Sequence, residues 1–352
     1  MTNPAPPGRR VRLDDVATEV GVSPATVSLV LRGIAGPSVA TRERVLAAAA
    51  RLGYRPDRAA SALASRRSRT VGVLIDVSNA YQARLVLDLY DAAERSGYSL
   101  ILSTISRSHD EGRAIETLLD SRCEALVLFG PEGSKRSLSE LGSTLPVVVV
   151  GRAVPAASVD VVRTADDDGI SAAVHHLAEL GHRRIAYVGG PRGTVATLRR
   201  TGYEAAMREV GLADFVVVVN GGDGESDGVR AAGSIVRRDP RPSALITFND
   251  RCAFGLIDAL TRAGIEVPAA VSVIGFDDSP EAALLQISLT TVAQDTRALA
   301  ENAMTSLVER LDLGRTSRRE VIVAPHLVVR GTTAAYRPAH VGATGTGPTG
   351  SA

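Results

Sequence analysis

Residues 13–31 read LDDVATEVGVSPATVSLVL, and this stretch indicates two short helices in the N-terminal part of the chain. Its first apolar residues recur at the spacing of one face of a short helix: Leu13, Val16, Ala17 and Val20. Gly21 ends that helix, Ser23 is suited to cap a second one, and Pro24 is suited to its first position. Two short helices joined by a tight turn with glycine are typical of a helix-turn-helix unit, although the same periodicity fits any small three-helix bundle.

The second predicted helix has one apolar face, made by Val27, Val30 and Leu31. Its other face and its N-terminal end can then meet base edges in a major groove. We therefore expect DNA contacts from Ser23, Pro24, Ala25, Thr26, Ser28, Leu29 and Arg32. A third helix is predicted between a cap at Ser38 and Gly53, and its inward residues are expected to be Val45, Leu46, Ala49 and Leu52.

Charge separates a basic head from a larger body. The chain has 352 residues, of which 45% are hydrophobic and 22% charged, and at about 100–200 residues per domain it is long enough for two or three domains. Residues 1–70 hold 12 Arg against 5 Asp and Glu, a net charge of +7, whereas the remainder holds 28 basic and 34 acidic residues, a net charge of −6. A basic head on a mildly acidic body indicates a polyanionic partner for the head.

The sequence shows no sign of a membrane or an oxidising compartment. No apolar run approaches the ~20 residues of a membrane span, and residues 1–10 contain no apolar segment typical of a signal peptide. Cys123 and Cys252 lie far apart without metal-ligand spacing, so we expect buried free thiols. These features predict a cytoplasmic protein without a membrane partner.

No motif predicts catalysis or metal binding. The acidic run 221–227 lacks the spacing of a calcium-binding loop, and we expect it to be a solvated loop. His175, His176 and His182 have no third metal ligand at suitable spacing. Because nucleophile elbows, phosphate-binding loops and carboxylate pairs in a catalytic context are also missing, we expect no enzyme activity, no catalytic residues, no cofactor and no metal.

From Thr70 onward, short apolar strands alternate with helical patterns in two successive series. The first series predicts strands at 71–75, 100–102, 125–129 and 147–150, with helices at 83–96 and 111–119. The second predicts helices at 169–180, 199–210, 229–237 and 252–263, with strands at 185–188, 215–219, 244–248 and 271–276. The predicted fold is therefore an all-α helix-turn-helix head followed by an α/β core of two doubly wound parallel-sheet lobes, with a ligand site beyond the C-terminal strand ends.

Several segments of the head resemble the lactose-repressor (LacI/GalR) family at matching spacing: Val16-Ala17, Gly21-Val22-Ser23, 25–28, 41–45 and 52–56. The core is similar to the type I periplasmic-binding-protein core of that family, for example at 180–186, 199–203, Asn249-Asp250, 275–278, 289–292 and 327–330. The resemblance covers most of residues 13–333. It implies a homodimeric transcription regulator, most simply a repressor, whose affinity for double-stranded operator DNA is controlled by a sugar or related polyol.

The resemblance also implies the limits of the domains. A helix-turn-helix domain at 12–56, a hinge helix and linker at 57–69 and an effector-binding core at 70–333 are expected between disordered ends at 1–11 and 334–352. The chain would cross between lobes near Val161, Thr291 and Ala324, which assigns 70–161 and 292–323 to the first lobe and 162–291 and 324–333 to the second.

In the hinge, Leu63 matches the family leucine that enters the central minor groove, and Arg58 and Ser61 are expected to contact DNA beside it. The alternative is an alanine-rich linker helix with Leu63 packed on the core.

Seven positions are expected to hold the effector by resemblance to the family: Asn79, Tyr81, Arg152, Arg199, Asn249, Asp277 and Gln294. Their chemistry suits a polyol, because a carboxylate accepts hydroxyl protons while Arg and Asn donate from a fixed fork. The alternatives are a surface ion pair for Arg199 and a helix cap for Asn249 or Asp277. Asp250 is expected to cap a helix rather than to touch the ligand.

Four departures from the family pattern predict an altered operator and an unusual effector. Leu29 and Ser61 stand where arginines are common, Gly151-Arg152 replaces Asp-Arg, and Ala165-Asp166 replaces Asp-Asn. Two other functions share parts of the pattern, an extracytoplasmic sugar-binding protein of a transporter and a sugar-modifying enzyme. The DNA-binding head argues against the first, and the missing catalytic constellation argues against the second.

Overall fold

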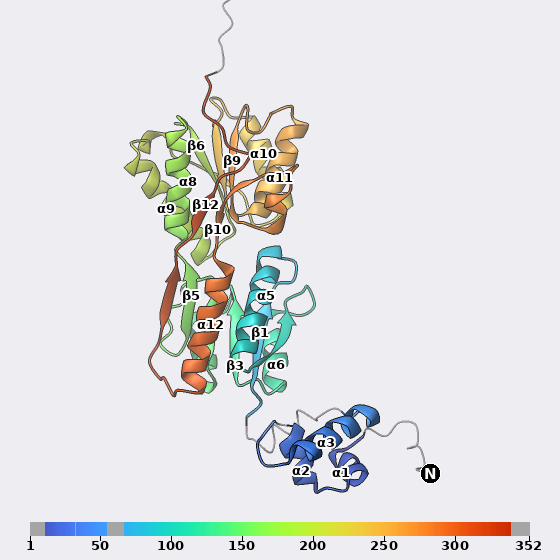
Figure 1. Cartoon of the computed structure of the whole chain (residues 1–352). Coiled ribbons are helices and arrows are strands. Elements are labelled where there is room, and N and C mark those ends of the chain that lie inside the picture. Colours follow the sequence, from blue (N-terminus) through green and yellow to red (C-terminus); the bar gives the residue numbers. More distant parts are fainter. Residues whose placement is uncertain (1–10, 32, 55–66, 339–352) are drawn as a thin grey trace, which may run out of the picture. The chain divides into compact units, whose positions relative to one another are not determined.

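The computed structural model describes residues 11–31, 33–54 and 67–338 (Figure 1). The chain divides between Arg69 and Thr70 into two compact units, and each is described by itself. None of the described helices is long and apolar enough to cross a bilayer.

The N-terminal unit consists of α1 (Leu13–Val20), α2 (Pro24–Leu31) and α3 (Val39–Leu52). Gly21 ends α1 with φ of 71°, a left-handed conformation that glycine adopts at little cost. The predicted caps are present: the Ser23 hydroxyl accepts a hydrogen bond from the Thr26 N–H at 3.2 Å, and the Ser38 hydroxyl accepts one from the Thr41 N–H at 3.3 Å. Sequence-local chemistry therefore sets the start of α2 and α3.

The three helices bury one small core: Val16, Ala17, Val20, Val27, Val30, Val45, Ala48 and Ala49. The prediction that Leu46 points inward is wrong, because its side chain is 48% exposed. In α3 the inward face follows Val45, Ala48, Ala49 and Leu52, the i, i+3, i+4, i+7 positions of a single stripe, and Leu46 lies one residue off it.

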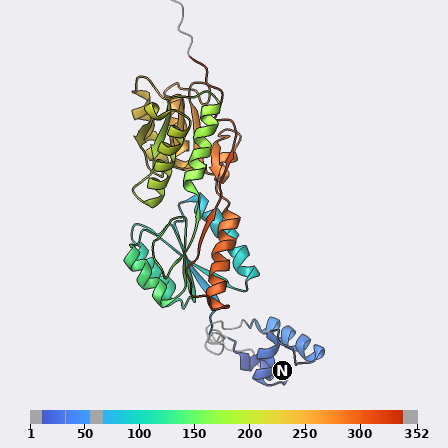
Figure 2. The same ribbon diagram turned by 90° about the vertical axis from the view of Figure 1, so that its left-hand side faces the viewer.

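The first lobe of the core is a six-stranded parallel sheet in the order β11-β5-β4-β3-β1-β2. Its strands are β1 (Thr70–Ile75), β2 (Ser99–Thr104), β3 (Ala125–Phe129), β4 (Val147–Val150), β5 (Asp160–Thr164) and β11 (Glu320–Val323). Helices α5 (Ala80–Arg95) and α12 (Thr296–Leu311) cover one face, and α6 (Glu111–Asp120) and α7 (Lys135–Thr144) cover the other (Figure 2).

The second lobe repeats this arrangement in the order β12-β10-β9-β8-β6-β7, with β12 antiparallel to β10. Its strands are β6 (Ile185–Gly189), β7 (Val217–Asn220), β8 (Ala244–Thr247), β9 (Ser272–Asp277), β10 (Thr290–Ala293) and β12 (His326–Val328). Helices α8 (Asp166–Glu179) and α9 (Thr194–Glu209) cover one face, and α10 (Glu225–Val236) and α11 (Asp250–Arg262) cover the other. Two short 3-10 helices, η1 (Ala213–Phe215) and η2 (Pro280–Ala283), follow α9 and β9.

Strand β1 shows why these strands read as unbroken apolar runs. Val71, Val73 and Ile75 pack toward α5 and α12, whereas Leu74 packs toward α6 and α7. A strand buried on both faces of a parallel sheet needs apolar residues at every position. Gly72 fits the same scheme, because a Cβ there would lie 2.6 Å from Leu126 Cδ2.

The chain crosses between lobes three times, after Thr164, after Ala293 and after Val323. The first two crossings lie a few residues beyond the predicted positions, because β5 and β10 belong entirely to the sheets that they complete. The expected disordered tail from residue 334 also starts too early. The Ala334 N–H donates to Ser272 Oγ at 3.1 Å, and the Tyr336 N–H donates to the Leu180 carbonyl at 2.8 Å.

Several elements differ from the sequence prediction. Helices α7 and α12 and strands β5, β10, β11 and β12 were not predicted, and α5, α8, α9 and α10 begin three to five residues earlier than expected. The first turns of α8 and α10 are rich in acidic and polar residues, which do not enter an apolar periodicity. Cys252 is buried as expected, whereas Cys123 is only half-buried, and both are free thiols.

Candidate effector pocket and DNA-binding surface

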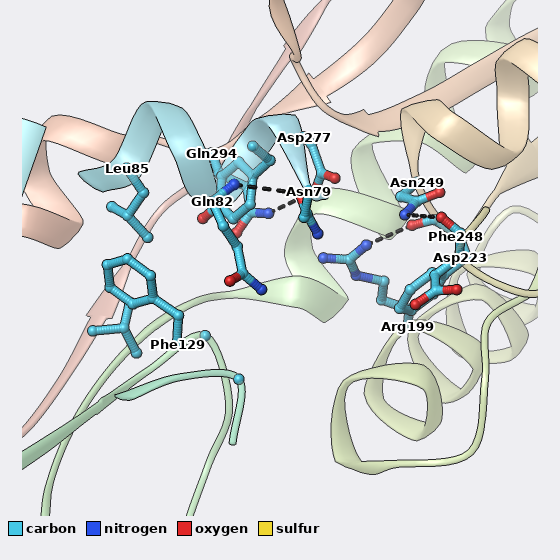
Figure 3. Close-up of a pocket in the computed structure, with 14 residues that line it drawn as sticks. Asn79, Gln82, Leu85, Phe129, Arg199, Asp223, Phe248, Asn249, Asp277 and Gln294 are labelled. Atoms are coloured by element: carbon cyan, nitrogen blue, oxygen red, sulfur yellow. Dashed lines mark hydrogen bonds between the residues drawn. The ribbon is translucent and has the colours of Figure 1, made fainter. Parts of the chain in front are cut away.

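A pocket of about 140 Å³ lies between the two lobes, at the carboxyl ends of their strands (Figure 3). Its lining residues come from both lobes. The first lobe contributes Asn79, Tyr81, Gln82, Leu85, Phe129, Gly130, Val150 and Gly151; the second lobe contributes Arg199, Asp223, Phe248, Asn249 and Asp277, and Gln294 lies at the second crossing between the lobes. In each sheet the strand order reverses beside the first strand of the lobe, β1 or β6, and ligands of doubly wound folds bind at such switch points. The topology thus brings the predicted polar residues to one place.

Six of the seven residues predicted to hold an effector line this pocket. The exception is Arg152, which faces a neighbouring cavity. Its guanidinium donates to the carbonyl of Pro131 and, at 2.7 Å, to that of Gly133. Burial lowers the Arg152 pKa, and Glu111 and Glu132 act against that shift. Arg152 is therefore engaged in holding the loop after β3.

Arg199 lies at the bottom of the pocket in a buried ion pair, so the alternative of a surface pair is wrong. Its Nε donates to Asp166 Oδ1 at 2.7 Å, and its Nη1 donates to the Phe248 carbonyl at 2.5 Å. The guanidinium carbon lies 3.5 Å from the centroid of the Phe276 ring, a cation–π arrangement. Burial disfavours the charged form of Arg199, but the carboxylates of Asp166 and Asp277 outweigh it and raise the Arg199 pKa.

Asp277, at the end of β9, is a hydrogen-bond acceptor of the pocket. Its Oδ1 accepts a hydrogen bond from Gln294 Nε2 at 2.8 Å, and Gln294 Oε1 accepts one from Thr164 Oγ1 at 2.5 Å. Burial raises the pKa of Asp277 to about 6, although Arg199 and the bond from Gln294 act in the opposite direction. The residue has φ of 122°, which is strained for a side chain with a Cβ and is typical of functional positions.

Asn249 both caps a helix and lines the pocket. Its Oδ1 accepts from the Cys252 N–H at 2.9 Å at the start of α11, and its Nδ2 donates to the Asp223 carbonyl at 2.9 Å. The helix cap, which was the alternative to ligand contact for Asn249, is therefore present, and the same residue also lines the pocket.

The acidic run 221–227 is more than the predicted solvated loop. Asp223 lines the pocket, and Asp227 accepts from the Gly224 N–H at 3.1 Å at the start of α10. Among the described residues, no group of His, Cys, Asp or Glu is arranged to hold a metal ion.

Asp250 lies behind the pocket. The prediction that it caps a helix is wrong, because Asn249 caps α11. Its Oδ1 accepts from Thr291 Oγ1 at 2.5 Å, and its Oδ2 accepts from the Ser279 N–H at 2.7 Å. It thereby fixes the turn after Asp277. Burial, and then the charge of Asp277, raise its pKa to about 8. Only glycine fits at position 275, because a Cβ there would lie 2.2 Å from Asp250 Oδ1.

The Tyr81 hydroxyl is buried in the pocket wall and has no hydrogen-bond partner among the described residues. Burial, with the charge of Asp277, raises its pKa well above 10. A buried hydroxyl without a partner is costly, so a ligand that satisfies it gains affinity.

Sequence reasoning missed several pocket residues. Phe129 and Phe248 are the last residues of predicted strands. Because ligands of such folds bind beyond strand ends, both could have been predicted as pocket residues. Gln82 lies one turn beyond Asn79 on α5, where helical spacing places both on one side. Val150 also closes a predicted strand and carries the same signal. Leu85 carries no such signal, because it reads as a core residue until the lobes are assembled.

The predicted DNA-contacting residues lie at the N-terminal end and outer side of α2. Ser23, Pro24 and Ala25 are exposed, and Thr26, Ser28 and Leu29 are partly exposed, while Val27 and Val30 are buried. Arg32, Arg58, Ser61 and Leu63 lie outside the described residues.

A helix-turn-helix head joined to a two-lobed binding core defines a class of DNA-binding transcription regulators. The chain belongs to the lactose-repressor family. Residues 12–57 match the family described as bacterial regulatory proteins, lacI family, and residues 174–333 match a periplasmic binding protein-like domain.

Three relatives illustrate the match. The HTH-type transcriptional regulator GalS of Salmonella typhimurium is 36% identical over 299 residues, which cover 83% of this chain and 88% of GalS. The structure of the lac repressor dimer bound to operator and the anti-inducer ONPF is 28% identical, with a TM-score of 0.79, over 93% of this chain and 100% of that one. The complex of the transcriptional regulator CelR with cellobiose is 27% identical, with a TM-score of 0.67, over 92% of this chain and 100% of that one.

Proposed function

We propose that this regulator binds operator DNA as a homodimer and represses transcription, and that a small sugar-like effector held between the lobes of each subunit controls its affinity for the operator. The observation that carries the proposal is the pocket itself, because residues of both lobes line it. A ligand there touches both lobes at once and can favour one arrangement of the lobes over another.

The two lobes also meet directly beside this pocket. Arg84 Nη1, on α5 of the first lobe, donates to the Asp278 carbonyl of the second lobe at 3.4 Å. Asp278 in turn follows Asp277, and its carboxylate pairs with Arg330 at 2.7 Å. A ligand bound to Asp277 thus acts on the residue next to an interlobe contact, which gives effector binding a route to the arrangement of the lobes.

Operator recognition is assigned to the exposed side of α2, with Ser23, Pro24, Ala25, Thr26, Ser28 and Leu29 in or beside the major groove. Arg32, Arg58, Ser61 and Leu63 are proposed to extend this contact, the last in the minor groove. A dimer is supported by the relative that binds operator as a dimer. We infer a regulator rather than an enzyme, working in the cytoplasm, from the relatives that carry regulators' names.

A gel-shift assay on DNA upstream of the gene, with and without a library of sugars and nucleosides, tests the proposal. We expect one shifted species whose stoichiometry is two chains per operator, and its release or stabilisation by at least one compound. The Asp277→Asn variant should bind the same DNA and lose the response to that compound. A protein that binds DNA tightly as a monomer, or whose variant responds like the wild type, contradicts the proposal.

A further inference from the structure

Four amide side chains line the pocket, and the oxygen of each one already accepts a hydrogen bond from the protein. Asn79 Oδ1 accepts from the Gln82 N–H at 3.3 Å, and Gln82 Oε1 accepts from the Asp76 N–H at 2.8 Å. Asn249 Oδ1 accepts from the Cys252 N–H at 2.9 Å, and Gln294 Oε1 accepts from the Thr164 hydroxyl at 2.5 Å.

The orientation of these four amides is fixed by chemistry. A backbone N–H can only donate, so the atom facing it on Asn79, Gln82 and Asn249 must be the oxygen. A carboxylate can only accept, so the Gln294 atom 2.8 Å from Asp277 Oδ1 must be the nitrogen. Each amide therefore turns its oxygen into the protein and keeps N–H groups for an occupant of the pocket.

These side chains consequently offer several N–H groups to an occupant. Each amide nitrogen carries two N–H groups. Asn249 donates one of its two to the Asp223 carbonyl, and Gln294 donates one of its two to the Asp277 carboxylate. Arg199 also keeps N–H groups beyond its bonds to Asp166 and Phe248. The oxygens of the described lining side chains that accept no hydrogen bond from the protein are the second oxygen of Asp277, the Tyr81 hydroxyl, which can also donate, and the exposed carboxylate of Asp223. The four amide oxygens each keep one lone pair, on the side of the protein group that they bind.

The first-lobe wall adds an apolar surface. Leu85, Phe129 and Val150 line the pocket with hydrocarbon, and Gly151 stands next to them at a position with φ of 96°. A ligand hydroxyl against this wall would find no side chain there to accept its hydrogen. The volume of about 140 Å³ is below that of pockets for drug-sized ligands, so the occupant is small.

Charge argues against an acid. The positive charge of Arg199 is already paired with Asp166 inside the lobe, and Asp277 and Asp223 add negative charge at the pocket. A carboxylate or phosphate ligand would therefore meet carboxylates without an uncommitted cation among the described lining residues.

We propose that the effector is an uncharged sugar derivative of about one ring that offers acceptor oxygens and an apolar group where a simple hexose offers hydroxyl hydrogens, as deoxy, O-methyl and N-acetyl sugars do. Its acceptor oxygens face the four amides and Arg199, one donor group meets Asp277, and the apolar group meets Leu85, Phe129 and Val150. This inference rests on the proposed function and specifies the ligand class of the same pocket.

Thermal-shift and calorimetric titration of the full-length protein test this directly. Glucose, galactose and mannose are compared with their 6-deoxy, methyl glycoside and N-acetylamino derivatives and with their uronates. Each buried hydroxyl hydrogen without an acceptor should weaken binding by about tenfold. We expect at least one uncharged derivative to bind about tenfold more tightly than its parent hexose. A parent hexose or a uronate as the tightest ligand, or no binding by any derivative, overturns the inference.

Two conservative variants probe the mechanism. Asn79→Asp and Gln82→Glu each keep the oxygen that holds a backbone N–H and replace the free N–H group by an acceptor oxygen. Each should shift the ratio of parent to derivative affinity toward the parent by about tenfold. Asn302→Asp, on α12, adds the same charge outside the pocket and serves as the control. Unchanged ratios in both pocket variants overturn the inference.

The gel-shift assay separates this inference from the proposed function. If a parent hexose binds best and releases the operator, the proposed function stands and the ligand class is wrong. If a derivative binds best while no compound changes operator affinity, the ligand class stands and effector control is wrong.

Discussion

Asp166 accepts a hydrogen bond from Arg199 Nε at 2.7 Å, and the two side chains are only 2% and 5% exposed. Asp166 occupies the first turn of α8, directly after the crossing from the first lobe, whereas Arg199 lies on α9. The pair therefore fixes the guanidinium under the pocket and joins α8 to α9 next to the interlobe crossing. Removing one partner of such a pair leaves an uncompensated buried charge.

The Asp166→Ala variant should be destabilised by about 3–5 kcal/mol, because Arg199 keeps its charge in an apolar site. Asp166→Asn leaves the same charge uncompensated and should cost somewhat less, since the amide oxygen still accepts from Arg199 Nε. Urea unfolding followed by circular dichroism measures both free energies. Equal losses in the two variants would show that charge, and not the hydrogen bond, holds Arg199.

Effector affinity should depend on the ionisation of Asp277. The pKa of this carboxyl is raised to about 6, mainly by burial, and the carboxylate is the form that accepts a second hydrogen bond from a ligand. Affinity should therefore be constant above about pH 7 and fall by up to about tenfold per pH unit below pH 6. Asp277→Asn should bind weakly with little pH dependence, and calorimetry between pH 5 and pH 8 compares the two. The same pH dependence in the variant would assign the titration to another group.

The free energy of unfolding should also depend on pH through the buried carboxyl of Asp250. Its folded pKa of about 8 lies above the value of about 3.9 for an unfolded chain. The stability that this group contributes is therefore fully present below about pH 4 and is lost as pH rises toward 8, by up to about 1.4 kcal/mol per pH unit. Asp250→Asn lacks this loss, so its free energy of unfolding relative to wild type should improve from pH 5 to pH 8. The control is Asp258→Asn, at a half-exposed carboxylate on the same helix; parallel wild-type and Asp250→Asn curves would refute the prediction.

DNA binding should depend steeply on salt. The net charge of +7 in residues 1–70 is doubled in a dimer, and each neutralised phosphate releases counterions. Affinity should fall on the order of 10³-fold between 50 and 200 mM salt. Fluorescence anisotropy with a labelled operator measures the slope, and a flat response would argue against extensive phosphate contact.

Operator preference should change when Leu29 is replaced by Arg. Leu29 is partly exposed on α2, between buried Val27 and Val30, and as an apolar side chain it can meet a thymine methyl group but cannot read guanine. An arginine there should add discrimination of about 1–3 kcal/mol in favour of guanine at one position of each half-site. Selection from a random DNA pool with wild type and Leu29→Arg shows the change. Identical half-sites from both proteins would mean that Leu29 does not face the bases.

The helices of the head, most helices and strands of the core and six residues of the pocket followed from the sequence alone. Apolar periodicity, the caps at Ser23 and Ser38 and the glycine turns are local signals, so the head helices follow from residues close together in the chain. Unbroken apolar runs such as 125–129 predict strands of a parallel sheet because both faces are covered. The resemblance to a known family then placed Arg199, Asn249, Asp277 and Gln294 in one pocket.

What these residues do in the pocket depends on packing between distant segments. Arg199 is paired with Asp166, 33 residues away in the chain, and Gln294 links Asp277 to Thr164, 130 residues away from Gln294. Pairings at such separations depend on how α8 and α9 pack and where the chain crosses between lobes, which local patterns do not encode. The apolar wall also depends on this packing: Leu85, Phe129 and Val150 are core residues of one lobe, and they become a binding surface because the second lobe faces them.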